Sequence, residues 1–186
     1  NKDSFTVMYH GVLAENRGLF ETIKAMVYVN KIVPNINLFI LGKGLVLDQM
    51  IELVDQLELK TCVYFHEAVS YDEIPDYISK ADVGIVPLPD ELCWQVSSPL
   101  KLLEYLAMAK PVIVSPIEAH ISVLNNFPAA IFLNSTSPED ISDGIIKAYN
   151  IRNQLCKFGI EGRKFVTENF TWNLQASKLE KFITNL

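Results

Sequence analysis

The stretch SSPLKLLEYLAMAKPVIVS (97–115) contains a polar loop, a helical pattern and a strand-like run in immediate succession. Its Ser-Pro pair is typical of a helix start and predicts Ser98 at the N-cap and Pro99 in the first turn of a helix over 99–109. The run PVIVS (111–115) is short and apolar, as a buried strand is. A loop, a helix and a strand in this order form the repeating unit of a parallel sheet that helices cover.

The same alternation runs through the whole chain. Six apolar runs are expected as strands, at 5–11, 36–42, 62–66, 82–88, 111–115 and 129–133. Helices are expected over 18–32, 45–59, 70–79, 99–109 and 118–126, and from 138 onward with breaks near 150 and at NFTW (169–172). The helix-start signals are Ser70 with Glu73, Ser137 with Pro138, and Thr171. This pattern predicts an α/β fold in one domain over 1–186, a Rossmann-like parallel sheet of about six strands with helices on both faces.

Composition restricts the classes of function. Hydrophobic residues make up 49% and charged residues 20% of the 186 residues, which is typical of a compact domain with one sizeable core. The formal net charge of −6 argues against a broad nucleic-acid or anionic-membrane surface. Cys62, Cys93 and Cys156 are widely spaced, and the histidines lack metal-ligand spacing. We therefore expect no disulfide framework, no metal site and a reducing, cytoplasmic location.

The ends of the chain and its apolar runs bear on its setting. The apolar runs are far shorter than the roughly 20 residues of a membrane-spanning helix, so no direct membrane insertion is expected. The chain opens with NKDSFTV, without an initiator Met or a signal-peptide pattern. We expect it to be a domain of a longer protein.

Ligands of such folds bind beyond the carboxyl ends of the strands, so the loops that follow strands are the candidate sites. In GVLAENRG (11–18), Gly11 ends a strand, and Arg17 stands where a guanidinium and a helix N-terminus could both meet a phosphate. A turn glycine and an exposed arginine are the alternative. In LGKGLVLD (41–48), G-x-G is half of a dinucleotide fingerprint, but Leu47 stands where the third glycine would be, which favours a tight turn.

The loop FHEAVSYDE (65–73) follows the third predicted strand. Its His66, Glu67 and Tyr71 could contact a base. A polar loop that caps a helix explains them equally well.

The loop PLPDELCWQVSSPLK (87–101) is unusually long for a strand-to-helix connection, and such loops are more often functional. The backbone N–H groups of Leu100 and Lys101, with the Lys101 ammonium, are expected to form a diphosphate cradle. Glu104, one turn further along, could hold two vicinal hydroxyls of a ribose or pair with Lys101 on a wet helix face. The helix has few other polar positions, so we expect a buried carboxylate that needs a partner, which favours the ligand.

Taken together, these segments resemble the donor-binding half of family-4 glycosyltransferases, retaining nucleotide-sugar enzymes of the GT-B fold. A common variant of their signature reads S-P-x-K-x-x-E-Y-x-A-x-G-K-P-V-I, and the chain matches it from Ser98 to Ile113, with Ala109 where glycine is usual. YHGVLAENRGLFETIKA, NLFILGKG, ADVGIVPL and ENFTWNLQASKLE are similar to family segments in the same order. The resemblance covers nearly the whole chain and identifies it as a carboxy-terminal, donor-binding domain.

The resemblance implies roles for individual residues. Arg17 and Lys101 would be the catalytic cations at the diphosphate, and Glu104 would hold the ribose hydroxyls. The four residues from Phe65 to Ala68 would line the base pocket. The full set of other donor-binding residues that it implies is Gly11, Phe65, His66, Glu67, Ala68, Ser98, Pro99 and Leu100.

Three positions depart from the family pattern. Val96 stands where the family has its first glutamate, which faces the donor sugar, so sugar recognition would pass to Asp90, Glu91 or Gln95, or change. Val12 replaces a basic residue that often follows the first glycine, and the glycine usual after the third strand is missing.

The implied function is transfer of a hexose from a UDP- or GDP-sugar to a glycan or lipid-linked acceptor. The missing amino-terminal half would bind the acceptor and could contact the inner membrane. The departing diphosphate would be stabilised by Arg17, Lys101 and a helix N-terminus, without metal or cofactor. This half alone is expected to bind nucleotide weakly and not to turn over. The alternatives are a GT-B-type epimerase or phosphorylase, and a non-catalytic or dinucleotide-binding Rossmann-like module centred on Gly42 and Gly44.

Overall fold

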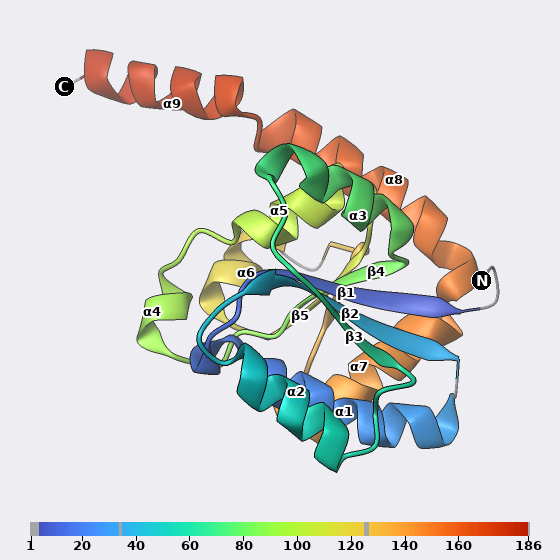
Figure 1. The fold of residues 1–186 in the computed structure, drawn as a ribbon. Helices are drawn as coiled ribbons and strands as arrows, with labels where there is room; N and C mark the ends of the chain where they lie inside the picture. Colours follow the sequence, from blue (N-terminus) through green and yellow to red (C-terminus); the bar gives the residue numbers. More distant parts are fainter. Residues whose placement is uncertain (1–3, 34, 125–126, 186) are drawn as a thin grey trace.

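The computed structural model describes residues 4–33, 35–124 and 127–185. Six strands form one parallel sheet in the order β3-β2-β1-β4-β5-β6 (Figure 1). The strands are β1 (Phe5–Val12), β2 (Ile36–Lys43), β3 (Val63–His66), β4 (Val83–Val86), β5 (Val112–Val114) and β6 (Ala130–Phe132). The α-helices are α1 (Leu19–Ile32), α2 (Leu47–Gln56), α3 (Ile74–Lys80), α4 (Leu92–Gln95), α5 (Leu100–Ala107), α6 (Glu118–Leu124), α7 (Pro138–Asn150), α8 (Arg152–Asn169) and α9 (Trp172–Thr184). Two 3₁₀ turns, η1 (Glu15–Arg17) and η2 (Tyr71–Glu73), lie in loops after β1 and β3.

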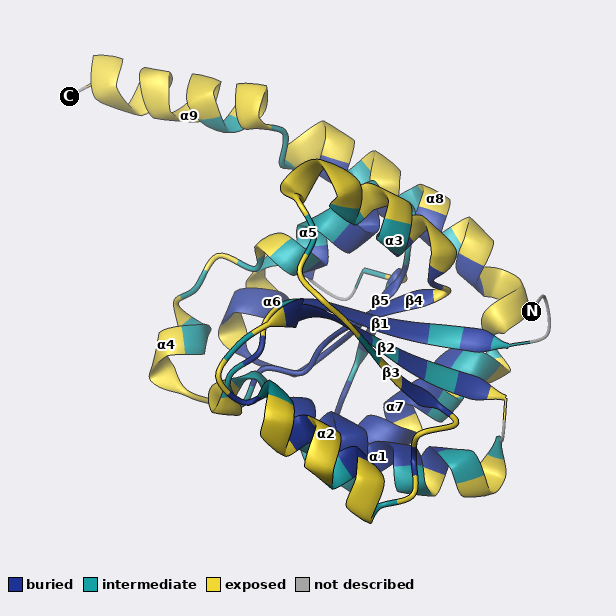
Figure 2. Cartoon of the chain, in the orientation of Figure 1, coloured by how far each residue is buried: buried dark blue, intermediate teal, exposed yellow. Residues whose placement is uncertain are grey.

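Helices enclose the sheet on both sides because the strands are apolar on both faces. One core cluster joins the sheet to α1, α2 and α7, and a second joins it to α3, α5, α6 and α8 (Figure 1). The strands lie at the buried centre, and the exposed residues lie on the outer sides of the helices (Figure 2). Met8 and Tyr9, neighbours on β1, are both fully buried, one in each cluster. The predicted α/β fold with a six-stranded parallel sheet is confirmed.

The helix starts that depend on local side chains are also confirmed. The Ser137 hydroxyl accepts a hydrogen bond from the Asp140 N–H at 3.2 Å, and Pro138 is the first residue of α7. The Thr171 hydroxyl accepts from the backbone N–H of Leu174 at 3.4 Å, at the start of α9. Ser70 and Glu73 form the predicted capping box before α3.

Two predictions about the start of α5, at the end of the long loop after β4, were wrong: Ser98 is not its N-cap, and Pro99 does not lie in its first turn. Pro99, and not Ser98, is the N-cap of α5, because its ψ of 63° is not helical. The backbone N–H of Leu100 donates to the Ser98 carbonyl at 2.9 Å, and this tight turn keeps Pro99 outside the helix. The loop also contains α4, which no periodic pattern announced because the helix is only four residues long. The last two residues of the predicted helix over 118–126 lie outside the described residues.

The final helix differs from the others. It extends away from the body of the domain (Figure 1), and it has no buried residue. Trp172, Leu179 and Phe182 on α9 are exposed. None of the helices in the described ranges is long and apolar enough to cross a membrane.

Candidate functional site

The carboxyl ends of β1 and β2 meet at two glycines. Gly11 pairs in register with Gly42, and its φ of +125° lies in the region that favours glycine. A Cβ on Gly11 would lie 2.4 Å from Cε of Lys101. The lack of a side chain at Gly11 therefore allows Lys101 of α5 to lie across the end of β1.

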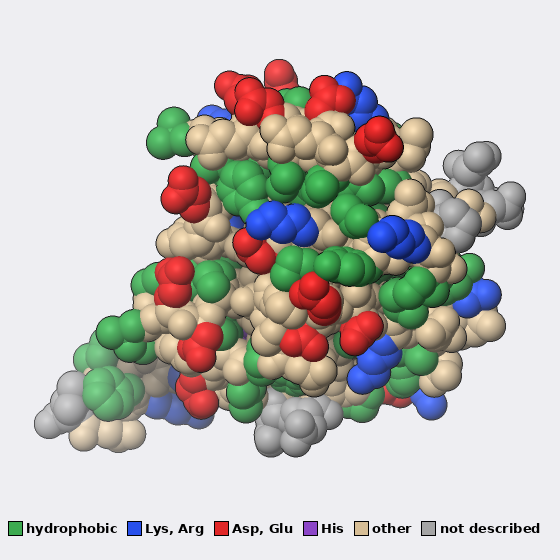
Figure 3. Space-filling view, turned by 90° about the horizontal axis from the view of Figure 1, so that it is seen from below, with side chains coloured by type: hydrophobic (Ala, Val, Ile, Leu, Met, Phe, Trp, Pro, Cys, Tyr) green, Lys and Arg blue, Asp and Glu red, His purple; other side chains and the backbone are tan. Residues whose placement is uncertain are grey.

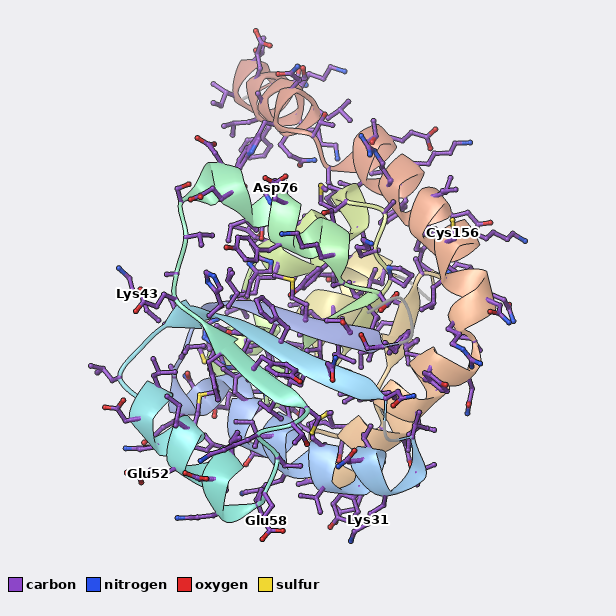
Figure 4. The ribbon with its side chains drawn as sticks, turned by 45° about the vertical axis from the view of Figure 1, so that its right-hand side comes forward. Lys31, Lys43, Glu52, Glu58, Asp76 and Cys156 are labelled. Carbon is purple, nitrogen blue, oxygen red and sulfur yellow. The ribbon has the colours of Figure 1, made fainter. Side chains whose placement is uncertain are left out.

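The two cations at this strand end are Arg17 and Lys101, and they are close enough for their charges to interact. The charge of Arg17 helps lower the pKa of Lys101 to about 8, although burial is the larger cause and Glu104 acts in the opposite direction. Neither cation forms an ion pair with a carboxylate in the described part of the chain. A third cation, Lys43, pairs in register with Val12 at the end of β2, and it is exposed and points outward (Figure 4). Arg17 and Lys101 thus present positive charge that an anion would neutralise.

Arg17 is held by a residue that the sequence did not single out. Its guanidinium carbon lies 4.2 Å from the centroid of the Trp94 ring, a cation–π contact. Arg17 Nε and Trp94 Nε1 are both buried without a hydrogen-bond partner among the described residues. Trp94 lies on α4, so the unpredicted helix in the long loop supplies the platform for Arg17. A tryptophan in a polar loop is the only sequence signal of this contact.

The start of α5 supplies one fewer free backbone donor than predicted. The N–H of Leu100 donates to Ser98, as described above, and the N–H groups of Lys101 and Leu102 have no acceptor among the described residues. Because α5 begins at Leu100, these belong to its first turn, whose unsatisfied N–H groups favour negative charge. The predicted cradle therefore contains the N–H and the ammonium of Lys101, with Leu102 in place of Leu100.

Glu104 has partners within the protein, and Lys101 is not one of them. The Tyr71 hydroxyl donates to Glu104 Oε1 at 3.2 Å, and Glu104 Oε2 lies 3.4 Å from His10 Nε2. No ion pair joins Glu104 to Lys101, both of which the structure describes, so the alternative of a surface pair between them is wrong. The Glu104 side chain is 26% exposed, less buried than its apolar helix suggested.

His10 is a neutral neighbour of Glu104 and was not predicted as a site residue. Burial, and secondarily the charge of Lys101, lower the pKa of His10 to about 4. The imidazole is therefore uncharged near pH 7, and its 3.4 Å contact with Glu104 is not an ion pair. Its position directly before Gly11 at the end of β1 was the available signal. The ring packs edge-on against Tyr105, with the centroids 5.0 Å apart.

The four residues that were predicted to line a base pocket, 65–68, lie in different surroundings at the end of β3 and in the loop after it. Phe65 packs against the core cluster on the α1 and α2 side of the sheet. His66 faces the other side, where its Nδ1 donates to the Glu67 carbonyl at 2.8 Å and its Nε2 lies 3.1 Å from the Tyr77 hydroxyl. Glu67 is exposed, and Ala68 is the one that lines a cavity with Gly11.

Three cavities lie along the carboxyl edge of the sheet and beside Glu104. The first, of about 190 Å³, is lined in part by Gly11 and Ala68. The second, of about 170 Å³, and the third, of about 370 Å³, both have Tyr71 and Glu104 in their walls. The predicted residues that line the third cavity are Ser98, Pro99, Leu100 and Glu104. Gly11 and Ala68 thus line one hollow, and Ser98, Pro99, Leu100 and Glu104 line another that also includes Tyr71.

The residues considered for sugar recognition are largely engaged with one another. The side-chain amide of Gln95 donates to Asp90, and its carbonyl oxygen accepts from the backbone N–H of Glu118 at 2.7 Å. Gln95 therefore ties α4 to the start of α6. Glu91 accepts a weak hydrogen bond from Cys93 at 3.6 Å. Val96, in place of the family's first glutamate, is 78% exposed.

The two glycines of the G-x-G motif have a structural explanation. A Cβ on Gly42 would lie 1.9 Å from the Gly11 carbonyl oxygen, and one on Gly44 would lie 1.8 Å from the Leu13 carbonyl oxygen. Both glycines let the chain at the end of β2 pass close to the backbone at the end of β1. Their occurrence therefore does not require a dinucleotide.

A larger hollow, of about 500 Å³, lies between α1 and α2, and neither Arg17 nor Lys101 lines it. Its walls carry Glu15, Glu21 and Glu52, which would repel a diphosphate. Acidic side chains are prominent on this face of the molecule (Figure 3). Among the described residues, no group of three His, Cys, Asp or Glu side chains could hold a metal ion.

Comparison with known proteins gives a consistent family match. The sequence model of the family described as "Glycosyl transferases group 1" matches residues 1–165. An uncharacterised glycosyltransferase of Methanocaldococcus jannaschii is 26% identical over 186 residues, which are 100% of this chain and 46% of that protein. The GDP-mannose-dependent alpha-(1-6)-phosphatidylinositol monomannoside mannosyltransferase of Mycobacterium tuberculosis is 23% identical over 180 residues, 96% of this chain and 47% of the relative. The chain spans about half the length of these curated relatives.

A solved structure agrees on the fold. Anabaena HepE in complex with UDP and glucose superimposes with a TM-score of 0.84 at 12% identity, covering 99% of this chain and 49% of that one. At this identity the similarity establishes the fold alone.

Proposed function

Because the chain belongs to the glycosyl transferases of group 1, we propose that it is the donor-binding domain of a retaining glycosyltransferase that transfers a hexose from a UDP- or GDP-sugar. The observation that carries the proposal is the pair of cations, Arg17 and Lys101, at the carboxyl end of β1. The pKa of Lys101 is lowered to about 8 by burial and by Arg17, so a bound anion would relieve a real electrostatic cost.

The proposed chemistry follows from this placement. When a sugar leaves its nucleoside diphosphate, negative charge grows on the diphosphate oxygen that is released. Arg17, the Lys101 ammonium and the first-turn N–H groups of α5 would stabilise that charge without moving. The retaining outcome rests on the resemblance to family-4 enzymes, and so does the absence of a metal or cofactor from the proposed reaction.

The nucleotide and the acceptor are proposed at the level of class. The M. tuberculosis relative is named as GDP-mannose-dependent, and HepE was solved with UDP, so both nucleotides are supported. The acceptor, a glycan or a lipid-linked sugar, would be bound by a further domain, since the chain spans about half the length of its curated relatives. The isolated chain would then bind nucleotide weakly and would not turn over.

A ligand panel tests the proposal. We expect UDP or GDP to raise the melting temperature of the chain, because a ligand at 100 times its Kd stabilises a protein by about 2.7 kcal/mol. ADP and NAD serve as comparison ligands at equal concentration. Stabilisation by NAD with none by any nucleoside diphosphate would reject the proposal in favour of the dinucleotide-binding module.

The role of Glu104 has its own test. Glu104→Gln should weaken binding of the better nucleotide about 10- to 100-fold, because a hydrogen bond to a charged group contributes about 1.5–3 kcal/mol. Glu52→Gln, on the exposed side of α2 (Figure 4), is the matched control and should leave affinity unchanged. Equal affinities of the two variants in calorimetry would remove Glu104 from the ribose site.

A further inference from the structure

The hydrogen bond between Tyr71 and Glu104 occupies an acceptor that the proposed function requires. The Tyr71 hydroxyl donates to Glu104 Oε1 at 3.2 Å. A ribose hydroxyl that bound Glu104 would donate to the same kind of oxygen in the same way. The other carboxylate oxygen faces His10, which is buried in the sheet and cannot move aside without disturbing the core.

Tyr71, by contrast, is poorly held. Its side chain belongs to the single turn η2, and the residue is 75% exposed. Little packing would be lost if the ring turned outward. The negative charge of Glu104 raises the pKa of Tyr71, as expected for a phenol that donates a hydrogen bond to a carboxylate.

The cavities place Tyr71 at a dividing point. The hollows of about 370 Å³ and about 170 Å³ share Tyr71, Glu104 and Ala107 in their walls. The smaller one shares Ile74 with the cavity of about 190 Å³ that Gly11 lines. Moving the Tyr71 ring would open space between the two hollows that Tyr71 and Glu104 both line.

We propose that Tyr71 is a gate on the ribose site: its hydroxyl occupies Glu104 in place of a ribose hydroxyl and is displaced when a nucleoside diphosphate binds. The inference rests on the proposed function, since it takes Glu104 as the ribose-binding residue. The Tyr71 hydroxyl and a ribose hydroxyl would both donate to Glu104, and Tyr71 lies in the walls of the two hollows that Glu104 also lines, so the affinity of the chain for a ribonucleotide would be reduced by the fraction of molecules in which Tyr71 holds Glu104.

The test is Tyr71→Phe, which keeps the ring and removes the competing hydroxyl. We expect calorimetry to show about 3- to 10-fold tighter binding of UDP or GDP, whichever the unmodified chain prefers. The corresponding 2′,3′-dideoxynucleoside diphosphate should gain nothing, because it does not compete for Glu104. Tyr64→Phe is the matched control, since Tyr64 is also exposed and its hydroxyl donates to the Thr61 carbonyl at 2.6 Å, on β3.

The outcomes separate the two proposals. Weaker ribonucleotide binding by Tyr71→Phe, no change, or an equal gain with the dideoxy compound would each overturn the gate. The gate can fail while the proposed function holds. The proposed function holds if the unmodified chain binds a nucleoside diphosphate and Glu104→Gln weakens that binding, whatever Tyr71→Phe does. If the unmodified chain binds none, the proposed function fails and the gate fails with it.

Discussion

Lys101 should make the folded domain less stable, and Lys101→Met should therefore stabilise it. Folding lowers the pKa of this ammonium from 10.5 to about 8, mainly by burial. At about 1.4 kcal/mol for each pH unit, the difference corresponds to about 3 kcal/mol. The side chain is only partly buried and solvent screens it, so we expect about 2 kcal/mol in practice. A methionine fills a similar volume without the charge.

The effect has a defined pH dependence. Below pH 8 the ammonium is charged in the folded and the unfolded chain, so the full cost is present. Between about pH 8 and 10.5 the folded chain has lost the proton that the unfolded chain still binds, so the stability of the unmodified chain rises with pH. Above pH 10.5, the ordinary pKa of a lysine, both states are neutral and the advantage of Lys101→Met disappears.

Urea unfolding between pH 6 and pH 10 measures the difference in free energy of unfolding between the two chains, and thermal unfolding measures the difference in melting temperature. At pH 7 the melting temperature of Lys101→Met should exceed that of the unmodified chain by about 4–8 °C. Lys164→Met is the control, because Lys164 is 74% exposed on α8 and its loss should change stability by less than about 0.5 kcal/mol. No gain for Lys101→Met at pH 7, or a gain that is undiminished at pH 10, would refute the reasoning. The same variant should lose most of its stabilisation by UDP or GDP.

Three further predictions concern the end of α5, the turn after β2, and α4. Ala109→Gly should stabilise the chain by about 1 kcal/mol, because Ala109 has a φ of +56°; urea unfolding tests this against Ala107→Gly, at the last residue of α5, where φ is not positive and the substitution should not stabilise the chain. Gly44→Ala should destabilise by about 1–3 kcal/mol, since its Cβ would lie 1.8 Å from a carbonyl oxygen; an unchanged unfolding midpoint would show that the turn can adjust. Trp94→Ala should weaken UDP or GDP binding about 3- to 10-fold and add little in an Arg17→Ala background; additive losses in calorimetry would contradict stacking.

Several residues of the candidate site could be predicted from the sequence, because each is marked by the residues directly beside it. Gly11 at a strand end and Lys101 at a helix start were singled out from their immediate neighbours, and the structure brings the two together. The N-cap of α5 was misplaced by one residue because a hydrogen bond between Leu100 and Ser98 competes with the helical conformation of Pro99. Proline and serine at a helix start permit both arrangements, so their identities alone do not choose.

The partners of Glu104 were not predictable in the same way. His10 comes from β1, Tyr71 from η2 and Glu104 from α5, and Tyr71 and Glu104 are 33 positions apart in the sequence. No periodicity or spacing connects them. They meet because of two features of the fold. β1 lies between β2 and β4 in the sheet, and α3 and α5 pack on the face of the sheet to which Met8 of β1 contributes.

The sequence by itself determined the alternation of strands and helices, because apolar periodicity and capping side chains act over a few residues. It also determined the residue types of the candidate site: a glycine at a strand end, an arginine in the loop after it, and a lysine and a glutamate in the helix after the long loop. Only the tertiary structure decided what each of them faces: Lys101 lies over Gly11, Arg17 lies on Trp94, and Glu104 lies between a buried histidine and an exposed tyrosine. The reason is that contacts between elements far apart along the chain depend on strand order and on how helices pack on the sheet, which local patterns do not specify.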